Sequence, residues 1–291
     1  MLLLRRIAEA KSPSRVKRAI ERALRIAFVF AIIIVILFPI WVIIAASFYP
    51  YQVHGREFRL ESLIPGNFTS TNYLYLRFDP QFALSIRNSV IVSLSNAIIC
   101  LLVALPAAYA FTRATFRLER WSFLWIMLCR VAPPGAFIVP LFIIYTSIGL
   151  YDTLLGVVIA HSVFNLPLAI WMLTGFMRDI PTTVDEAAFV DGHSMWEFWT
   201  NIFLPLMLPA IGVTTFFLWM FSWTEVLLVT AVTQLRAYTM TTQLLLYTSG
   251  YTGFGFVAAA GVISMIPGLI LLFFARRFIA RGFMLGGAIK T

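Results

Sequence analysis

The stretch IAFVFAIIIVILFPIWVIIAASF, residues 26–48, decides the fold class because it contains no Lys, Arg, Asp or Glu. A helix rises 1.5 Å per residue, so roughly 20 apolar residues cross the hydrocarbon core of a bilayer. The whole chain of 291 residues has the same character, being 60% apolar and 12% charged with a mean hydropathy of +0.88. Soluble proteins carry about 25% charged residues. The composition therefore excludes a soluble domain and predicts an all-α, polytopic membrane protein.

Five further segments of about 20 residues or more also lack charged side chains, and with the first stretch they predict six transmembrane helices. The predicted spans are about residues 26–48, 86–112, 122–147, 153–177, 203–231 and 256–276. They divide the chain into a basic N-terminal segment (1–25), a six-helix membrane domain (26–276) and a C-terminal tail (277–291).

The distribution of basic residues predicts the orientation of the spans. With the N-terminus inside, the inner segments hold 16 of the 22 Lys and Arg residues, and the outer loops hold five. Basic residues accumulate on the cytoplasmic side of membrane helices, so both termini are predicted to be cytoplasmic. The same residues face anionic lipid. The bilayer therefore accounts for the net charge of +9, and no nucleic-acid partner is expected.

The inner segment between the fourth and fifth spans predicts an ordered elbow of two helices over residues 183–201. Thr183 followed by Glu186 has the spacing of a capping box, in which the hydroxyl and the carboxylate bind reciprocal backbone N–H groups. Gly192 then permits a turn, and Pro205 marks the start of the fifth span. An elbow that projects from the membrane needs a partner for its apolar side. A helix lying on the membrane surface is the alternative interpretation.

The residues of this elbow match a known motif at every fixed position. Glu186-Ala187-Ala188 is followed by three residues, Gly192, nine residues and Ile202-Phe203-Leu204-Pro205. This spacing resembles the EAA loop of ABC importer permeases, which lies in a cytoplasmic loop before the penultimate span. In that family the loop forms the coupling helix, which sits in a cleft of the ATP-binding subunit. The resemblance implies that the elbow contacts a separate ATPase.

The resemblance extends over about residues 20–291. Its further motifs are Ala107–Phe111 with Arg113 at the end of the second span, and Trp223-Thr224-Glu225 in the fifth. The tail Arg281–Lys290 resembles the carbohydrate-uptake branch of the family, the branch of the maltose importers. The chain departs from the family pattern at Thr224, where Asn is usual, and at Met284-Leu285, where Leu-Thr is usual.

The function that the resemblance implies is that of a permease subunit in an ATP-driven, binding-protein-dependent importer of a bacterial-type cytoplasmic (inner) membrane. Such a subunit forms half of the path for a carbohydrate or polyol, and sugar, sugar alcohol, glycerol and glycerol phosphate all remain open. The implied partners are two ATP-binding subunits, a second homologous permease and a periplasmic or extracellular solute-binding protein. The alternative is a stand-alone secondary transporter of a small polar solute, which typically shows inverted repeats and intramembrane carboxylates.

The lysines of the chain exclude a phosphate-binding loop of its own. Lys11, Lys17 and Lys290 are its only lysines, and none follows glycine in the G-x-x-x-x-G-K-[ST] pattern. The chain is therefore not expected to be an enzyme, and ATP hydrolysis is expected on a separate subunit that holds ATP and Mg. No cofactor is expected on this chain, because its Cys and His residues lack metal-ligand spacing.

The resemblance assigns coupling to the elbow, since a rigid lever is needed to move the spans between two states. Glu186 is the candidate for a charged contact with the ATPase, or it serves as the capping-box carboxylate, and the two roles are compatible. Asp191 either caps the second half of the elbow or contacts the partner. Gly192 is expected to be needed for backbone geometry. The implied coupling residues are Glu186, Ala187, Ala188, Asp191, Gly192, Ile202, Leu204 and Pro205.

Two charged residues lie inside predicted spans, where charges are costly and are functional candidates. Arg130 either pairs with a carboxylate or carbonyls between helices, or extends its long side chain to the inner interface. Glu225 either lines the outer gate or reaches water in the outer leaflet. Rings and hydroxyls on the fifth span suit a sugar, although packing is the alternative for each Trp. The substrate-path candidates are Thr215, Trp219, Trp223, Thr224 and Glu225.

The basic, Gly-rich tail has two interpretations. Chain ends commonly fray. The resemblance instead implies that the tail reaches along the ATPase subunits and contacts them through Gly286, Gly287 and Lys290.

Overall fold

The computed structural model describes residues 15–50, 68–114, 119–249 and 253–288, with side chains from Ile20 to Phe278 within these ranges. Every regular element in the described ranges is a helix. Five of these helices are long and apolar enough to cross a membrane, or six if one sharply bent pair counts as a single span. The all-helical architecture with several membrane spans is therefore confirmed.

Four of the predicted spans are single helices, namely α2 (Arg15–Ser47), α4 (Pro80–Arg113), α7 (Leu154–Arg178) and α13 (Phe254–Ala288). Each contains an internal proline, a residue that is more frequent in transmembrane helices than in soluble ones. These prolines are Pro39, Pro106, Pro167 and Pro267. Helix α13 does not end with the predicted span but continues through residues 277–288, the first part of the predicted tail.

The third predicted span is not one straight helix. The chain forms α5 (Glu119–Val131), a short 3-10 turn η2 (Pro134–Phe137) and α6 (Ile138–Ser147), and the two halves are bent by 88°. The break falls at the Pro133-Pro134 pair. Proline has no N–H to donate and disfavours the helical conformation of the residue before it. Apolar length alone therefore predicted a continuity that these two residues prevent.

The fifth predicted span ends earlier than expected. Helix α10 (Leu204–Thr224) stops at Glu225, whose backbone is extended, and a separate helix α11 (Leu227–Val232) follows. The carboxylate of Glu225 accepts a hydrogen bond of 2.8 Å from the backbone N–H of Leu228. The side chain thus satisfies an N–H at the start of α11, which favours a new helix over continuation of the old one.

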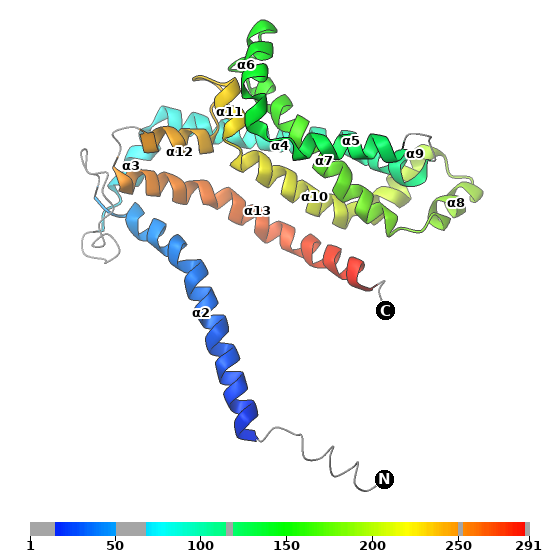
Figure 1. The fold of residues 1–291 in the computed structure, drawn as a ribbon, viewed down its shortest axis with the longest axis horizontal. Coiled ribbons are helices and arrows are strands. Elements are labelled where there is room, and N and C mark those ends of the chain that lie inside the picture. The colour runs from blue at the N-terminus through cyan, green and yellow to red at the C-terminus, as the bar shows by residue number, and fades with distance from the viewer. Residues whose placement is uncertain (1–14, 51–67, 115–118, 250–252, 289–291) are drawn as a thin grey trace.

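The membrane core is formed by α4, α7, α10 and α13 (Figure 1). Helix α4 packs most extensively against α7, and small residues at the contact, including Ala104 and Ala169, allow close approach. Asn96 on α4 accepts a hydrogen bond of 2.8 Å from Asn165 on α7 and donates one of 3.0 Å to Ser162. These side-chain bonds hold the two helices in register inside an apolar environment.

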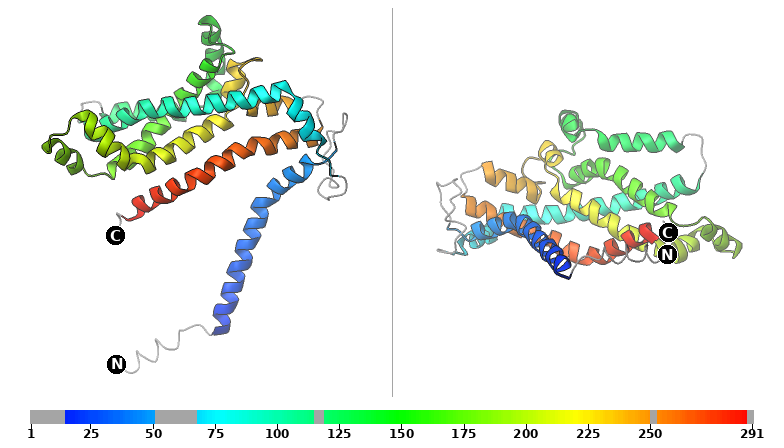
Figure 2. Two further views of the ribbon diagram at one scale, coloured as in Figure 1. Left: turned by 180° about the vertical axis from the view of Figure 1, so that it is seen from behind. Right: turned by 60° about the horizontal axis from the view of Figure 1, so that its bottom comes forward.

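Helix α2 leaves this core. It contacts α13 near its C-terminal end and then diverges from the other helices (Figures 1 and 2). Gly255 permits the contact, because a methyl group there would lie 2.7 Å from the backbone oxygen of Tyr49. Along the diverging part, large apolar side chains such as Phe28 and Leu37 are exposed. The other described residues therefore leave this length of α2 free to face lipid or another subunit.

The two ends of the bundle carry different structures. At one end, α8 (Thr183–Val190) and α9 (Met195–Glu197) project beyond α7 and α10, and at the other lie the short helices α3 (Thr71–Phe78) and α12 (Met240–Ser249) (Figure 1). The link between α6 and α7 carries a separate clamp at Asp152, which has φ +56°. Its carboxylate accepts hydrogen bonds from the backbone N–H groups of residues 234–237 at 3.0–3.3 Å. Asp152 thus joins the link before α7 to the loop after α11.

Asp152→Ala is expected to loosen this loop. Desolvation raises the pKa of Asp152, but the hydrogen bonds from Gln234, Ala237, Arg236 and Leu235 outweigh it and leave the pKa below its usual value of 3.8. The hydrogen bonds to the Asp152 carboxylate therefore contribute stability at pH values above the usual pKa, and this stability is lost as the pH falls through the lowered pKa. Because the site is partly solvated, we expect a loss of roughly 1–2 kcal/mol. Amide hydrogen exchange at residues 234–237 should rise several-fold near neutral pH.

The matched control is Asp152→Asn, which keeps one acceptor oxygen and should show a smaller effect. Acidification should bring the exchange rates of the wild-type and Ala chains together, because the wild-type carboxylate then becomes protonated. Equal protection of residues 234–237 in the wild-type and Ala chains at neutral pH would contradict the role given to Asp152.

Candidate functional site

The predicted elbow is present between α7 and α10. Helix α8 (Thr183–Val190) is followed by a turn at Gly192, the short helix α9 (Met195–Glu197) and a π-helical segment η3 (Phe198–Phe203) that leads into α10. Gly192 has φ +86°, a conformation that only glycine adopts without strain. The N–H groups of Gly192 and His193 bond back to the carbonyls of Phe189 and Ala188, which closes the end of α8.

The capping box lies one helix later than predicted. Residue Thr182, not Thr183, precedes the first turn of α8, and its backbone is already helical with no side-chain hydrogen bond to the helix. The reciprocal bonds are instead made by Ser194 and Glu197 at the start of α9, at 3.3 Å and 2.8 Å. Glu186 is therefore not a capping-box carboxylate, and Ser194 rather than Asp191 caps the second half of the elbow.

An ion pair that the sequence analysis missed fixes the elbow to α4. The guanidinium of Arg113 donates to the carboxylate of Asp185 at 2.8 Å and to the backbone carbonyl of Ile180 at 2.9 Å. The hydroxyl of Tyr109 donates to the same carboxylate at 3.0 Å. The side chains of Arg113 and Asp185 are only 11% and 9% exposed. Such a buried, multiply bonded pair holds one geometry better than an exposed pair does.

The base of the elbow is also packed. Phe198 and Phe203 are fully buried, and the ring of Tyr109 lies 5.2 Å from those of Trp199 and Phe203. Ala188 is buried as well, so α8 approaches the bundle closely on one side. Aromatic contacts of this kind, together with the ion pair, make the elbow a stiff extension of α4, α7 and α10.

The opposite side of the elbow is uncovered. Glu186, Ala187 and Asp191 are exposed, and the apolar side chains of Val190 and Trp196 are 86% and 77% exposed. Of the other residues implied in coupling, Gly192 and Pro205 are exposed, and Ile202 and Leu204 are half-buried. The exposed surface of the elbow, here called its tip, includes the apolar side chains of Val190 and Trp196 and the carboxylates of Glu186 and Asp191.

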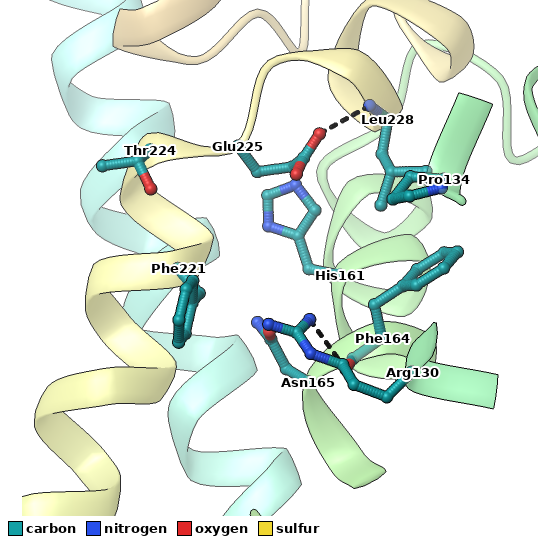
Figure 3. A pocket seen from close by; sticks show the side chains of 9 residues that line it. All are labelled: Arg130, Pro134, His161, Phe164, Asn165, Phe221, Thr224, Glu225 and Leu228. Atoms are coloured by element: carbon teal, nitrogen blue, oxygen red, sulfur yellow. Dashed lines mark hydrogen bonds between the residues drawn. The ribbon is translucent and has the colours of Figure 1, made fainter. Parts of the chain in front are cut away.

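A second site is a cavity of about 350 Å³ where both helix breaks meet (Figure 3). Arg130, in the last turn of α5, donates to the backbone carbonyl of Phe164 at 3.2 Å, and its guanidinium carbon lies 5.0 Å from the ring centre of Phe221. Arg130 is therefore held between helices by a carbonyl and a ring, one of the two arrangements expected from the sequence. The lining residues are Arg130, Pro134, His161, Phe164, Asn165, Phe221, Thr224, Glu225 and Leu228.

The substrate-path candidates divide between this cavity and the protein interior. Thr224 and Glu225 line the cavity. Trp219 and Trp223 are buried and stack on each other, with ring centres 4.9 Å apart and planes within 18°. The hydroxyl of Thr215 donates to the backbone carbonyl of Ile211. Asn165, which the sequence analysis did not select, joins the cavity to the α4–α7 contact.

The tail residues are only partly described. Gly286 and Gly287 lie on the backbone of α13, whereas Lys290 lies outside the described residues. Among the residues that the structure describes, no three His, Cys, Asp or Glu side chains are grouped so that they could hold a metal ion.

Comparison with known proteins places this architecture in a family. A family model for the binding-protein-dependent transport system inner membrane component matches residues 100–284. The trehalose transport system permease protein SugB of Mycobacterium tuberculosis is 30% identical over 233 residues, which cover 78% of this chain and 84% of SugB. The diacetylchitobiose uptake system permease protein NgcG of Streptomyces coelicolor is 28% identical over 275 residues, which cover 93% and 89% of the two chains.

Solved structures agree at the level of the fold. A crystal structure of a bacterial ABC transporter involved in the import of the acidic polysaccharide alginate matches with a TM-score of 0.72 at 19% identity, and the match covers 91% of this chain and 98% of that chain. The family model spans more than half of the chain, and the helices match its description as a membrane component. The chain belongs to the inner-membrane component family of binding-protein-dependent transport systems and is a multi-pass permease subunit of an ABC importer in the cytoplasmic membrane.

Proposed function

We propose that this permease subunit forms half of the path for a carbohydrate or polyol and is driven by a separate ATPase that docks on the elbow. The observation that carries the proposal is a stiff elbow with an uncovered tip. The ion pair of Asp185 with Arg113 fixes the base of the elbow to α4, while Val190 and Trp196 remain exposed at its tip. An apolar tip on a rigid support has the form of a surface that is buried by a partner.

The proposed assembly contains two ATP-binding subunits, a second homologous permease and an external solute-binding protein. The ATPase subunits hold ATP and Mg and carry out hydrolysis, and this chain contributes no catalytic residue. The excess of Lys and Arg in the two terminal segments and in the inner loops supports a cytoplasmic position for both termini and for the elbow. The apolar face of α2, which is exposed among the described residues, is available to lipid or to the partner permease.

The carbohydrate class is supported by relatives. SugB is named for trehalose and NgcG for diacetylchitobiose, and both resemble this chain over most of its length. A stand-alone secondary transporter has less support, because the family is one of subunits that depend on a binding protein. The elbow also has no use in a protein that works without an ATPase.

The roles of the elbow residues follow from exposure. Glu186 makes the charged contact with the ATPase, since its carboxylate is exposed and caps no helix. Asp191, exposed at the C-terminal end of α8, contacts the same subunit, while Ala187 permits close approach. Ala188 and Gly192 shape the elbow itself, and Ile202, Leu204 and Pro205 transmit its movement into α10.

Glu186→Lys is expected to weaken association with the ATPase subunit. The reversal replaces an attraction by a repulsion at an interface, and such changes cost at least about tenfold in affinity. The measurement is the amount of ATPase that co-purifies in detergent with a tagged chain. Glu21→Lys is the matched control, because Glu21 is an exposed carboxylate on α2, far along the chain from the elbow. Equal recovery of the ATPase with both variants would contradict the role of Glu186.

A further inference from the structure

The cavity lies where two helix breaks face each other. One break separates α5 from η2, and the other separates α10 from α11 at Glu225. Breaks at membrane depth are tolerated where the freed backbone is buried or lines a water-filled cavity, and transporters place binding sites at such points. Two breaks that meet at one cavity of about 350 Å³ are therefore an arrangement suited to a bound polar molecule.

The cavity contains two opposite charges that do not pair with each other. Within the part of the chain that the structure describes, the ion pair present is that of Arg113 with Asp185. Arg130 has a carbonyl and a ring as neighbours, and Glu225 accepts one backbone hydrogen bond from Leu228. Each of the two charged groups thus keeps hydrogen-bonding capacity for a molecule between them.

The third polar group is His161 on α7, which is only 2% exposed. Its Nδ1 atom shares a hydrogen bond of 2.7 Å with the hydroxyl of Ser222, while its Nε2 atom has no hydrogen-bond partner among the described residues. Figure 3 shows the imidazole between the carboxylate of Glu225 and the guanidinium of Arg130. A buried ring nitrogen without a partner costs free energy, and a ligand hydroxyl in the cavity would remove that cost.

We infer that this cavity binds one ring, or a short chain, of a neutral polyhydroxylated solute. The guanidinium of Arg130 donates to hydroxyl oxygens, the carboxylate of Glu225 accepts from hydroxyl groups, and Nε2 of His161 bonds a hydroxyl between them. The rings of Phe221 and Phe164 offer apolar faces to the C–H side of a sugar. A hydroxyl both donates and accepts hydrogen bonds. One polyol can therefore accept from the guanidinium of Arg130 and donate to the carboxylate of Glu225 at the same time.

Two features restrict the class of solute. The charges of Arg130 and Glu225 balance, so the cavity offers no net charge to an anion. Its volume is near the lower limit for small-molecule sites, roughly 300–1,000 Å³, which suits a single ring rather than several rings at once. The inference rests on the proposed function and adds to it a binding site and the restriction to a neutral solute of about one ring.

The test uses the whole importer, purified with its ATPase subunits, partner permease and binding protein. Thermal unfolding of this complex is followed with glucose, trehalose, glycerol and the anionic sugar glucuronate. At least one neutral probe is expected to raise the unfolding temperature, and Glu225→Gln should weaken its apparent affinity about tenfold. The same variant leaves Arg130 as an uncompensated charge, so glucuronate should now bind where it did not bind before.

Two controls separate the possible failures. Glu119→Gln, in the first turn of α5 and outside the cavity, should leave all four titrations unchanged. Arg130→Gln should weaken binding of the neutral probe without creating affinity for glucuronate. General destabilisation of the complex would not produce this difference between the Arg130 and Glu225 variants. The inference is overturned if no neutral probe stabilises the wild-type complex, or if Glu225→Gln changes neither affinity. Failure of the ATPase to co-purify with the wild-type chain would instead count against the proposed function.

Discussion

Replacing Asp185 with Arg is expected to reduce solute uptake at least tenfold while the chain still inserts in the membrane. The substitution places two positive charges together at a site where both side chains are about nine-tenths buried. Breaking such a pair costs roughly 3–5 kcal/mol, and each 1.4 kcal/mol corresponds to a factor of ten. The elbow would therefore lose the contact that fixes α8 to the end of α4. Uptake by reconstituted vesicles is the measurement.

The exchange of both charges gives the sharper comparison. Asp185→Arg combined with Arg113→Asp restores an ion pair across the same contact and should recover a substantial part of uptake. Arg178→Asp is the control, because Arg178 is an exposed basic residue at the end of α7. If the double exchange recovers nothing and Arg178→Asp is as harmful as Asp185→Arg, the ion pair does not position the elbow.

The second large effect is expected at the tip of the elbow. Val190→Asp replaces a side chain that is 86% exposed with a carboxylate, so the chain without its ATPase partner tolerates the change. If the tip is buried by an ATPase subunit, the same carboxylate must be desolvated in the complex, which costs several kcal/mol. Association with the ATPase should then fall by at least about tenfold, measured as co-purification over a range of ATPase concentrations.

Leu235→Asp is the matched control for the tip. Leu235 is 63% exposed and lies in the loop between α11 and α12, outside the elbow. It should leave ATPase association unchanged. Trp196→Ala should weaken association as well, because it removes an exposed ring from the same tip. Loss of association with Leu235→Asp but not with Val190→Asp would place the interface elsewhere.

The elbow shows what sequence could and could not predict at this site. The Glu186-Ala187-Ala188 motif and the turn at Gly192 are local patterns, and the structure has a helix and a left-handed glycine at those positions. Asp185 escaped notice because its importance depends on Arg113, which lies 72 residues away. The pairing of a basic residue at the end of one helix with an acid on a later helix is visible only when the helices are packed.

The spans show a similar division. Length and apolarity predicted the helices of the core, because both quantities depend only on neighbouring residues. The breaks at Pro133-Pro134 and Glu225 were missed because apolar length was used without weighing the proline pair or the carboxylate that accepts a hydrogen bond from the N–H of Leu228. The cavity follows from those two breaks. Arg130 and Glu225 were each selected as charges in the membrane, but nothing local indicated that they share one cavity.

The most direct test of the coupling role is the accessibility of the elbow tip in the assembled importer. A single cysteine at Val190, in a chain whose native Cys100 and Cys129 are replaced by alanine, is treated with a membrane-impermeant thiol reagent. The account predicts labelling only from the cytoplasmic side in vesicles without the ATPase, and protection when the ATPase is present. Labelling from the outer side, or equal labelling with and without the ATPase, would contradict it.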